Sequence, residues 1–218
     1  MGDHRKVVPL FFVFLTEHHM TLLATTKLEA VNIMLAAIQE APVSTIDDDT
    51  IEDAAIAVQQ LDQVCKELQT KPWHFNTDHD YPLEVNADGK IPYPPTAAHC
   101  DPELYEDRDL VKRGNFFYDK DRRTFLFPAG TKIHFSITWM LDFEDMPMGF
   151  RSYCAMVAAN RFANYQMGDD ASSKYTEIDV QRAYSLAVAD DLRRADLNAL
   201  RGSRSVGNIL RRRRTWHG

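Results

Sequence analysis

Apolar residues recur at alternating spacings of three and four in two stretches of the first third of the chain. In residues 26–42 this pattern predicts an amphipathic helix, which Pro42 would end. Thr26 and Glu29 form an S/T-x-x-E capping box, which satisfies free amide donors of a first helical turn. Residues 49–71 predict a second helix, joined to the first by a short loop as an antiparallel hairpin. Its apolar seam comprises Ile51, Ala54, Val58, Leu61, Cys65 and Leu68.

Residues 73–145 lose the helical period and become rich in prolines, turn residues and β-forming residues. Two hairpins are predicted there, one around the turn Asn86–Gly89 and one around the polar stretch Asp119–Arg123. A half-buried strand is predicted in residues 131–141, where apolar and mostly polar residues alternate. Its inward positions are Ile133, Phe135, Ile137, Trp139 and Leu141. We therefore expect a small antiparallel β-domain between helices.

Helical spacing returns in residues 145–168 and, with a more polar character, in residues 174–200. The apolar side of the third helix comprises Phe150, Cys154, Val157, Ala158, Phe162 and Tyr165, and Gly168 suits its C-terminal cap. The whole pattern predicts an α+β protein. Its architecture would be an antiparallel bundle of about four helices, an inserted small antiparallel β-domain and an extended C-terminal tail.

The predicted domain organisation has four parts. They are an N-terminal extension (residues 1–21), a helical domain (residues 22–72 and 146–200), an inserted β-domain (residues 73–145) and a flexible basic C-terminal arm (residues 201–218). The extension contains an apolar run that is too short to span a bilayer. Three interpretations of it stay open: an upstream stretch of the reading frame before a native start at Met20, an export signal, or a hydrophobic arm that packs on a neighbour.

Charge is distributed unevenly along the chain. The 218 residues include 25 basic and 32 acidic side chains, but no Asp or Glu lies at or beyond residue 201. An acidic body with a net charge of −13 is thus followed by a tail with six arginines. Such a tail could bind nucleic-acid phosphates, remain a solvated end, or dock on an acidic partner with an aromatic anchor. The candidate partner-binding residues are Arg201, Arg204, Arg211, Arg212, Arg213, Arg214 and Trp216.

Motifs for catalysis or cofactor binding are missing from the sequence. The chain has no P-loop, no GxGxxG, GxSxG or HExxH motif and no calcium-loop pattern. Its three cysteines are too widely spaced for a zinc site or a disulfide framework, and they fit a reducing compartment. We therefore predict no catalytic residue, no cofactor and no metal.

Four features of the sequence could indicate a binding or catalytic site, but for each of them a structural interpretation is favoured. A metal could bind His74, Asp78, His79 and Asp80, although an exposed turn is the favoured interpretation. The stretch TIDDDTIED (residues 45–53) lacks the glycine and final glutamate of a calcium loop and fits an acidic helix start. Bases could stack on Phe116, Phe117, Tyr118, Phe125 and Phe127, although these residues fit a β-core better. Paired carboxylates could cleave glycans, but solvated acids are the favoured interpretation.

Five stretches of the chain, taken in order, resemble one known family. They are AVNIMLAAIQEAPVST (30–45), DAAIAVQQLDQV (53–64), WHFN (73–76), RGNFFYDKDRRTFLF (113–127) and FEDMPMGFRSYCAMVAANRFANYQMG (143–168). The ordered set is similar to tail tubular protein A of short-tailed phages (podoviruses), also called the tail adaptor, gatekeeper or head-to-tail connector. The resemblance covers roughly residues 22–195. Gln39 departs from it at a turn where the family usually has glycine, and the arginine-rich end lies outside it.

The resemblance implies a structural virion protein of the phage tail, assembled in the host cytoplasm, with no enzymatic activity and no membrane partner. The resemblance also implies that twelve copies of the protein assemble into a ring between the portal and the tail nozzle (tail tubular protein B). Such a ring extends the channel for genomic DNA, and tail fibres attach nearby. An acidic body suits such a channel because it disfavours binding to phosphates.

A ring needs two different contact faces on each subunit. The predicted fourth helix and the seam of the second helix are our candidates for those faces. Two other functions stay open as alternatives. One is a tail-associated glycan or cell-wall hydrolase, and the other is a nucleic-acid-binding protein that acts through the arginine tail.

Overall fold

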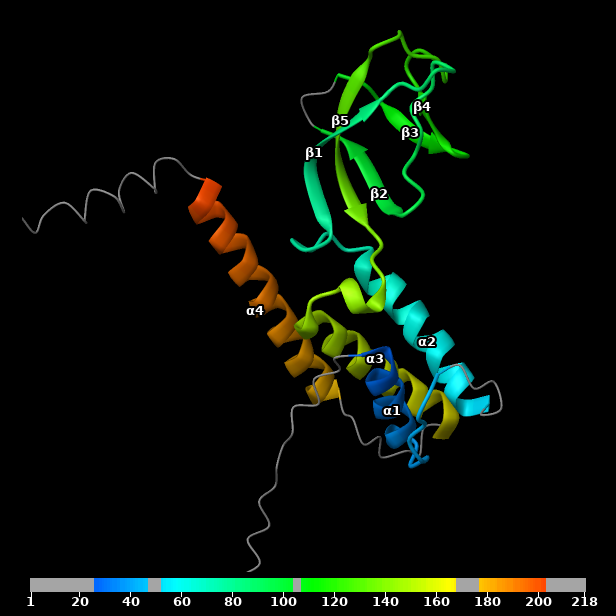
Figure 1. Cartoon of the computed structure of the whole chain (residues 1–218), viewed down its shortest axis with the longest axis vertical. Coiled ribbons are helices and arrows are strands. Elements are labelled where there is room, and N and C mark those ends of the chain that lie inside the picture. The colour runs from blue at the N-terminus through cyan, green and yellow to red at the C-terminus, as the bar shows by residue number, and fades with distance from the viewer. Residues whose placement is uncertain (1–25, 47–51, 104–106, 168–176, 203–218) are drawn as a thin grey trace, which may run out of the picture.

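The computed structural model of the chain describes residues 26–46, 52–103, 107–167 and 177–202 (Figure 1). Within them lie four α-helices: α1 (Lys27–Ala37), α2 (Glu52–Gln69), α3 (Met148–Met167) and α4 (Glu177–Gly202). Five strands, described below, all lie between α2 and α3 in the chain. This order confirms the α+β class. The predicted N-terminal extension, the centre of the acidic stretch and the arm beyond residue 202 lie outside the described residues.

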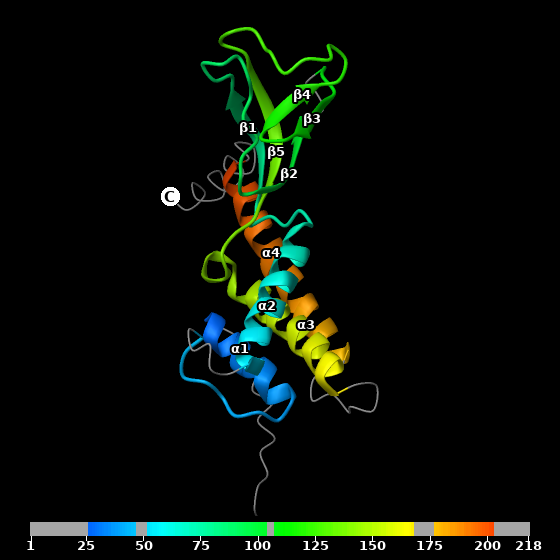
Figure 2. The same ribbon diagram turned by 90° about the vertical axis from the view of Figure 1, so that its right-hand side faces the viewer.

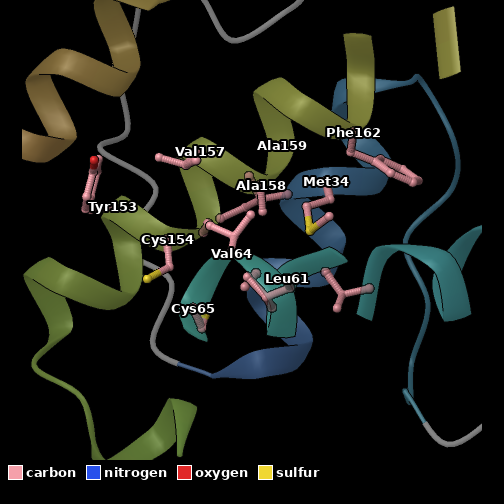
Figure 3. Packing of buried hydrophobic residues seen from close by; sticks show 14 of the residues in the cluster. Met34, Leu61, Val64, Cys65, Tyr153, Cys154, Val157, Ala158, Ala159 and Phe162 are labelled. Carbon is pink, nitrogen blue, oxygen red and sulfur yellow. The ribbon is translucent and has the colours of Figure 1, made fainter. Parts of the chain in front are cut away.

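We call α1 to α4 the helical unit, and α3 lies at its centre. It contacts each of the other three helices, with α4 on one side and α2 on the other (Figures 1 and 2). Met34, Leu61 and Phe162 converge in the core from α1, α2 and α3 (Figure 3). The helices pack closely because the buried side of α3 is rich in alanine.

The predicted apolar seam of α2 faces this core and not the surface. Leu61, Cys65 and Leu68 are buried against the rest of the helical unit. The seam is therefore already covered within one chain, and the expectation that it meets a neighbouring subunit is wrong. The predicted apolar side of α3 is buried from Phe150 to Phe162, but Tyr165 at its end is 74% exposed.

Both ends of α1 are fixed by local hydrogen bonds. The capping box is confirmed, because Thr26 Oγ1 accepts from the Glu29 amide at 3.2 Å and Glu29 Oε2 accepts from the Thr26 amide at 3.1 Å. The helix ends at Ala37, so Pro42 does not end it. Instead the Gln39 and Glu40 amides donate back to the carbonyls of Ala36 and Leu35, at 3.3 and 3.0 Å. This pair of bonds is a Schellman motif, and it places Gln39 at a φ of 65°.

The β-insert, which we define as β1 to β5, contains two antiparallel sheets. β1 (Thr77–Glu84), β5 (Lys132–Trp139) and β2 (Ala97–Pro102) form a sheet in the order β1-β5-β2. β3 (Leu110–Arg113) and β4 (Phe116–Asp119) form a hairpin beside it. The predicted alternation is confirmed in β5, where Ile133, Phe135 and Ile137 are buried in a second hydrophobic core. Whether the insert and the helical unit are separate domains with the predicted boundaries stays a prediction.

Both predicted turns form, but the strands beside them pair differently from the prediction. The Asn86 amide donates to the Lys90 carbonyl at 2.8 Å across the first turn, yet β1 pairs with the distant β5. The segment after this turn contains Pro92, which has no amide to donate to a ladder. β4 pairs with the preceding β3, and after the second turn only a single bridge joins Asp119 to Thr124. The first predicted hairpin is thus replaced by a long-range pair, β1 with β5, and the second by a different local hairpin, β3 with β4.

Candidate assembly surfaces

Two buried amide side chains hold the junction between the helical unit and the β-insert. Gln69, at the end of α2, donates to the Leu141 carbonyl at 3.1 Å and accepts from the Leu141 amide at 2.8 Å. Asn76 donates to the carbonyls of Gln69 and Trp139, and its oxygen accepts from the Trp73 amide at 2.9 Å. Both side chains are 1% exposed. Buried amides with all their hydrogen bonds formed fix the local backbone geometry. The segment that enters the β-insert before β1 is therefore held against the segment that leaves it after β5.

α4 reaches the same junction from the other side. The two carboxylate oxygens of Asp191 accept from the backbone amides of His74 and Phe75, at 3.0 and 3.3 Å. The Trp73 ring lies edge-on to Tyr184 of α4, with 6.3 Å between centroids. These contacts hold α4 at a defined angle to the insert. Sequence reasoning assigned the WHFN stretch to the family resemblance and to a doubtful metal site, and it missed this role. The sequence signal for this role is Asn76, a polar residue that directly follows the aromatic residues Trp73 and Phe75.

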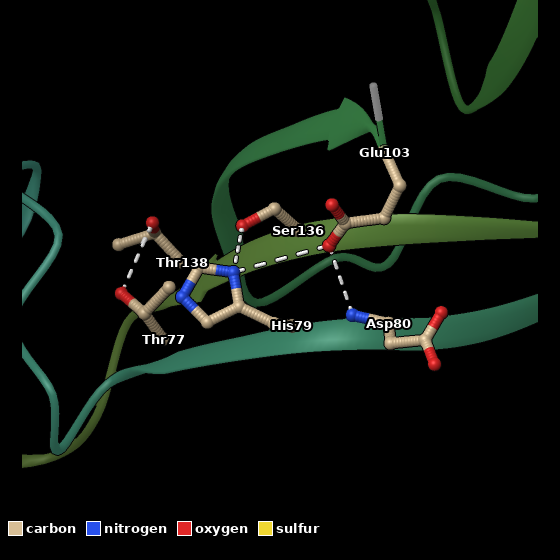
Figure 4. A network of polar contacts seen from close by, with 6 residues as sticks. All are labelled: Thr77, His79, Asp80, Glu103, Ser136 and Thr138. Atoms are coloured by element: carbon tan, nitrogen blue, oxygen red, sulfur yellow. Dashed lines mark hydrogen bonds and ion pairs between the residues drawn. The ribbon is translucent and has the colours of Figure 1, made fainter. Parts of the chain in front are cut away.

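β1 carries a bulge at the position of the predicted metal cluster. Asp78 pairs with Ile137 and Tyr81 with Phe135, so His79 and Asp80 are inserted between regular pairs. Asp80 has a φ of 59°, and its amide donates to a carboxylate oxygen of Glu103 at 2.9 Å (Figure 4). In the described part of the chain, no three His, Cys, Asp or Glu side chains are placed to hold a metal.

The polar network at this bulge resembles a catalytic triad in composition only. Ser136 Oγ lies 2.9 Å from His79 Nδ1, and a Glu103 oxygen lies 3.9 Å from the same nitrogen (Figure 4). A triad needs the nucleophile and the carboxylate on opposite nitrogens of the imidazole, so that a proton can pass through the ring. With both groups at Nδ1, this arrangement cannot activate the serine.

The proposed stacking platform belongs to the β-core and its edge. Phe117 and Phe127 are buried, and Tyr118 stacks edge-on to Phe125 with 4.9 Å between centroids. The Arg113 guanidinium covers the Tyr118 ring at 3.8 Å. These contacts support the favoured interpretation of a β-core over a base-stacking surface.

The three cysteines are free and buried. Burial raises the pKa of the Cys100 thiol to about 12. Burial also raises the pKa of Cys154 well above its ordinary value, and a hydrogen bond with Cys65 raises it further. Since the thiolate is the reactive form, Cys100 and Cys154 serve as packing groups at neutral pH.

Three large apolar side chains of α4 are exposed among the described residues, on a side of the helix that also carries Arg182 and Arg193. Ile178, Leu186 and Leu192 are 62%, 54% and 58% exposed. At 3.6 residues per turn they share the side of the helix opposite Val180 and Ala187, which are buried toward α3. We call these three residues the outer face of α4. α4 therefore has one apolar side that packs inside the helical unit, and an outer side of exposed apolar and basic residues that a partner could contact.

A groove of about 450 Å³ lies on the opposite side of the helical unit, between α2 and α3. It is lined by Ile56, Gln59, Gln60, Gln63, Val64, Arg161 and Tyr165. No carboxylate lines it, so this groove does not supply the acid pair that a glycan hydrolase would use. Uncharged amides and an exposed aromatic ring are instead groups that a partner helix can pack against.

The predicted partner-binding residues of the arm are almost all outside the described residues. α4 extends to Gly202, so the backbone of Arg201 lies in its last turn. Arg204, Arg211 to Arg214 and Trp216 lie beyond the described part of the chain. Their role in binding a partner stays a prediction. In the described residues, no helix is long and apolar enough to cross a membrane.

The chain thus has a rigid junction at Gln69 and Asn76 and two surfaces that a partner could contact, the outer face of α4 and the groove between α2 and α3. Such features suit a structural assembly protein. The comparison with protein families agrees. A family model described as Tail tubular protein matches residues 28–197, and the chain belongs to this family. It is therefore a structural protein of a phage tail. No curated protein matched the chain.

Proposed function

We propose that the protein is a ring-forming adaptor that joins the portal to the tail nozzle of a short-tailed phage. The observation that carries the proposal is the outer face of α4. It presents three large apolar side chains that remain exposed in the described part of the chain. Because each is already partly buried, burying the exposed part in a partner would contribute about 1–2 kcal/mol per side chain, below the full value for an apolar residue.

The two sides of the helical unit supply the unlike faces that a closed ring needs. α4 and α2 lie on opposite sides of α3 (Figure 1). The groove is formed between α2 and α3, away from α4. In the proposed ring, the outer face of α4 of one subunit packs into the groove of the next. This contact is heterologous, so repeating it by a fixed rotation generates a ring.

The proposed ring has twelve subunits and surrounds the path of the genomic DNA. Its partners are the portal on one side and the nozzle, tail tubular protein B, on the other, with tail fibres attached nearby. The family match supports a place in the virion tail. The acidic body supports a channel role, because negative charge around the DNA disfavours adhesion to phosphates. Assembly would take place in the host cytoplasm.

The substitution Leu186→Glu tests the proposed ring contact. A carboxylate on the outer face of α4 would have to be desolvated in the groove, so we expect ring formation to be lost. The folded monomer should be retained, because the Leu186 side chain is exposed. Sedimentation velocity would report assembly, and thermal unfolding would report the fold. Ser44→Glu adds the same charge at an exposed loop position between α1 and α2 and should assemble like the wild type. Rings formed by the Leu186→Glu protein would refute the contact.

A further inference from the structure

The two sides of the β-insert carry opposite charge. Along the edge strand β1, Asp78, Asp80 and Glu84 are exposed acidic residues, and we call them the acidic edge. The β3–β4 hairpin and the turn after it, residues 110–123, have a net charge of +3, and we call this segment the basic hairpin. Its basic residues are Lys112, Arg113, Lys120, Arg122 and Arg123, and its acidic residues are Asp119 and Asp121. β1 and the hairpin lie on opposite sides of the insert in both views (Figures 1 and 2).

Aromatic rings hold the basic hairpin in place without neutralising it. The Lys112 ammonium lies 4.0 Å from the centroid of the Tyr93 ring, and the Arg113 guanidinium lies 3.8 Å from that of Tyr118. Within the described part of the chain, Lys112, Arg113 and Arg123 form no ion pair, whereas Arg122 lies 4.0 Å from Asp119 and Lys120 pairs with Asp109. A cation–π contact restrains the side chain and leaves its full charge. The hairpin therefore presents fixed positive charge on a strongly acidic body.

The acidic edge is suited to contacts with side chains of a partner and not to backbone pairing with another β-strand. β1 is an edge strand, and exposed edges can pair with foreign strands. Here the bulge at His79 and Asp80 and the missing amide of Pro82 interrupt the row of donors. Asp78 accepts a hydrogen bond from the neutral Trp139 indole at 2.8 Å, which orients the carboxylate and leaves its charge. Glu84 lies 3.5 Å from Lys132.

We infer that the basic hairpin of one subunit docks against the acidic edge of the next copy of this chain. The inference rests on the proposed ring and names a second contact within it. Complementary charges on opposite sides of one subunit fit a head-to-tail neighbour, and they exclude the reversed orientation because like charges would then meet. Because the junction ties the insert to the helices, this contact would repeat at the same angle in every subunit.

Charge reversal on each side tests the contact in the full-length protein. Lys112→Glu with Arg123→Glu changes the net charge of residues 110–123 from +3 (five basic, two acidic) to −1 (three basic, four acidic), so both sides of the insert become acidic. Asp80→Lys with Glu84→Lys changes the acidic edge from −3 to +1, so both sides become basic. We expect each double variant to need at least about a tenfold higher concentration to assemble, because like charges would face each other. Both are exposed changes, and thermal unfolding would show that each monomer is folded.

Mixing the two double variants gives the sharpest result. In a 1:1 mixture every acidic side can face a basic one, so we expect rings of alternating subunits to form. The wild-type assembly should also weaken as salt shortens the range of charge interactions to less than about 10 Å. Sedimentation velocity with one variant fluorescently labelled would detect the mixed rings.

The possible failures are distinguishable. A wild-type protein that stays monomeric, alone and with the portal, would overturn the proposed ring and this contact together. A wild-type ring whose double variants assemble unchanged, or are not rescued by mixing, would overturn this contact alone.

Discussion

At the scale of single residues, Gln39 occupies a backbone conformation that favours glycine. Its φ of 65° lies in the left-handed region, where a side chain crowds the backbone at a cost of about 1–2 kcal/mol. The Schellman bonds that end α1 require this conformation at the position after the cap. The departure from glycine noted in the sequence is therefore a point of local strain, and it leaves the end of the helix unchanged.

Replacing Gln39 with glycine should stabilise the protein. The left-handed strain would be removed, and part of the gain would be offset by the greater freedom of glycine in the unfolded chain, so we expect about 0.5–1 kcal/mol. Chemical denaturation would show a higher midpoint with an unchanged slope. The neighbouring change Glu40→Gly is the matched control, since Glu40 is not among the residues with positive φ and should lose stability on becoming glycine. Equal destabilisation by both changes would contradict the strain argument.

At the scale of elements, helices were predictable from sequence and strand pairing was not. The capping box and the apolar spacing of α1 to α4 are local signals, and each corresponds to an observed helix. β5 was predictable because its alternation is also local. Its partners were not, because β1 lies about 50 residues away and no turn signal specifies that pairing. The same limit hid Gln69 and Asn76, whose hydrogen bonds join segments that are distant in sequence.

The pairing of α2 with α3 includes an ion pair whose contribution depends on pH. Arg161 donates two hydrogen bonds to the Glu67 carboxylate, at 2.6 and 2.9 Å. These bonds lower the pKa of Glu67 below its ordinary value of 4.5. A carboxyl group with a lowered folded-state pKa contributes stability that is present above the ordinary pKa. That stability is lost as pH falls through the lowered pKa.

A double-mutant cycle with Glu67→Gln and Arg161→Gln should therefore show coupling at pH 7 and weaker coupling at pH 3, because the carboxylate is lost as pH falls through the lowered pKa of Glu67. Both side chains are about half exposed, so solvent screening limits the coupling energy to about 0.5–1 kcal/mol. Urea unfolding at both pH values would measure it. The single variant Glu67→Gln is the control. It has no carboxylate at this position, so the ion pair with Arg161 contributes nothing to its stability at either pH. A coupling energy that persisted unchanged at pH 3 would show that packing, and not charge, links the two side chains.

At the scale of the whole molecule, the chain presents three kinds of surface to its neighbours. The helical unit has the outer face of α4 and the groove on its opposite side. The β-insert has its two charged sides, and the junction fixes them relative to the helices. The basic arm starts where α4 ends, so its attachment point is set by the same helix that carries the outer face. The sequence revealed the charge of the arm because charge is a property of composition. It could not reveal the exposed faces, which depend on how the elements pack.

Deleting residues 203–218 should weaken attachment to the portal and leave the ring intact. The deletion keeps α4 to its last residue, so thermal unfolding and ring formation should not change. It removes five arginines and Trp216 from every subunit. Because many arms act together in a ring, a modest loss for each arm multiplies, and we expect at least about a tenfold loss of portal affinity. Two full-length variants separate the causes: Arg211 to Arg214 changed to lysine should retain most of the affinity, and the same four changed to glutamine should not. If portal attachment is unchanged by the deletion, the arm is a solvated end. If the glutamine variant instead loses a salt-dependent affinity for DNA, the arm binds phosphates.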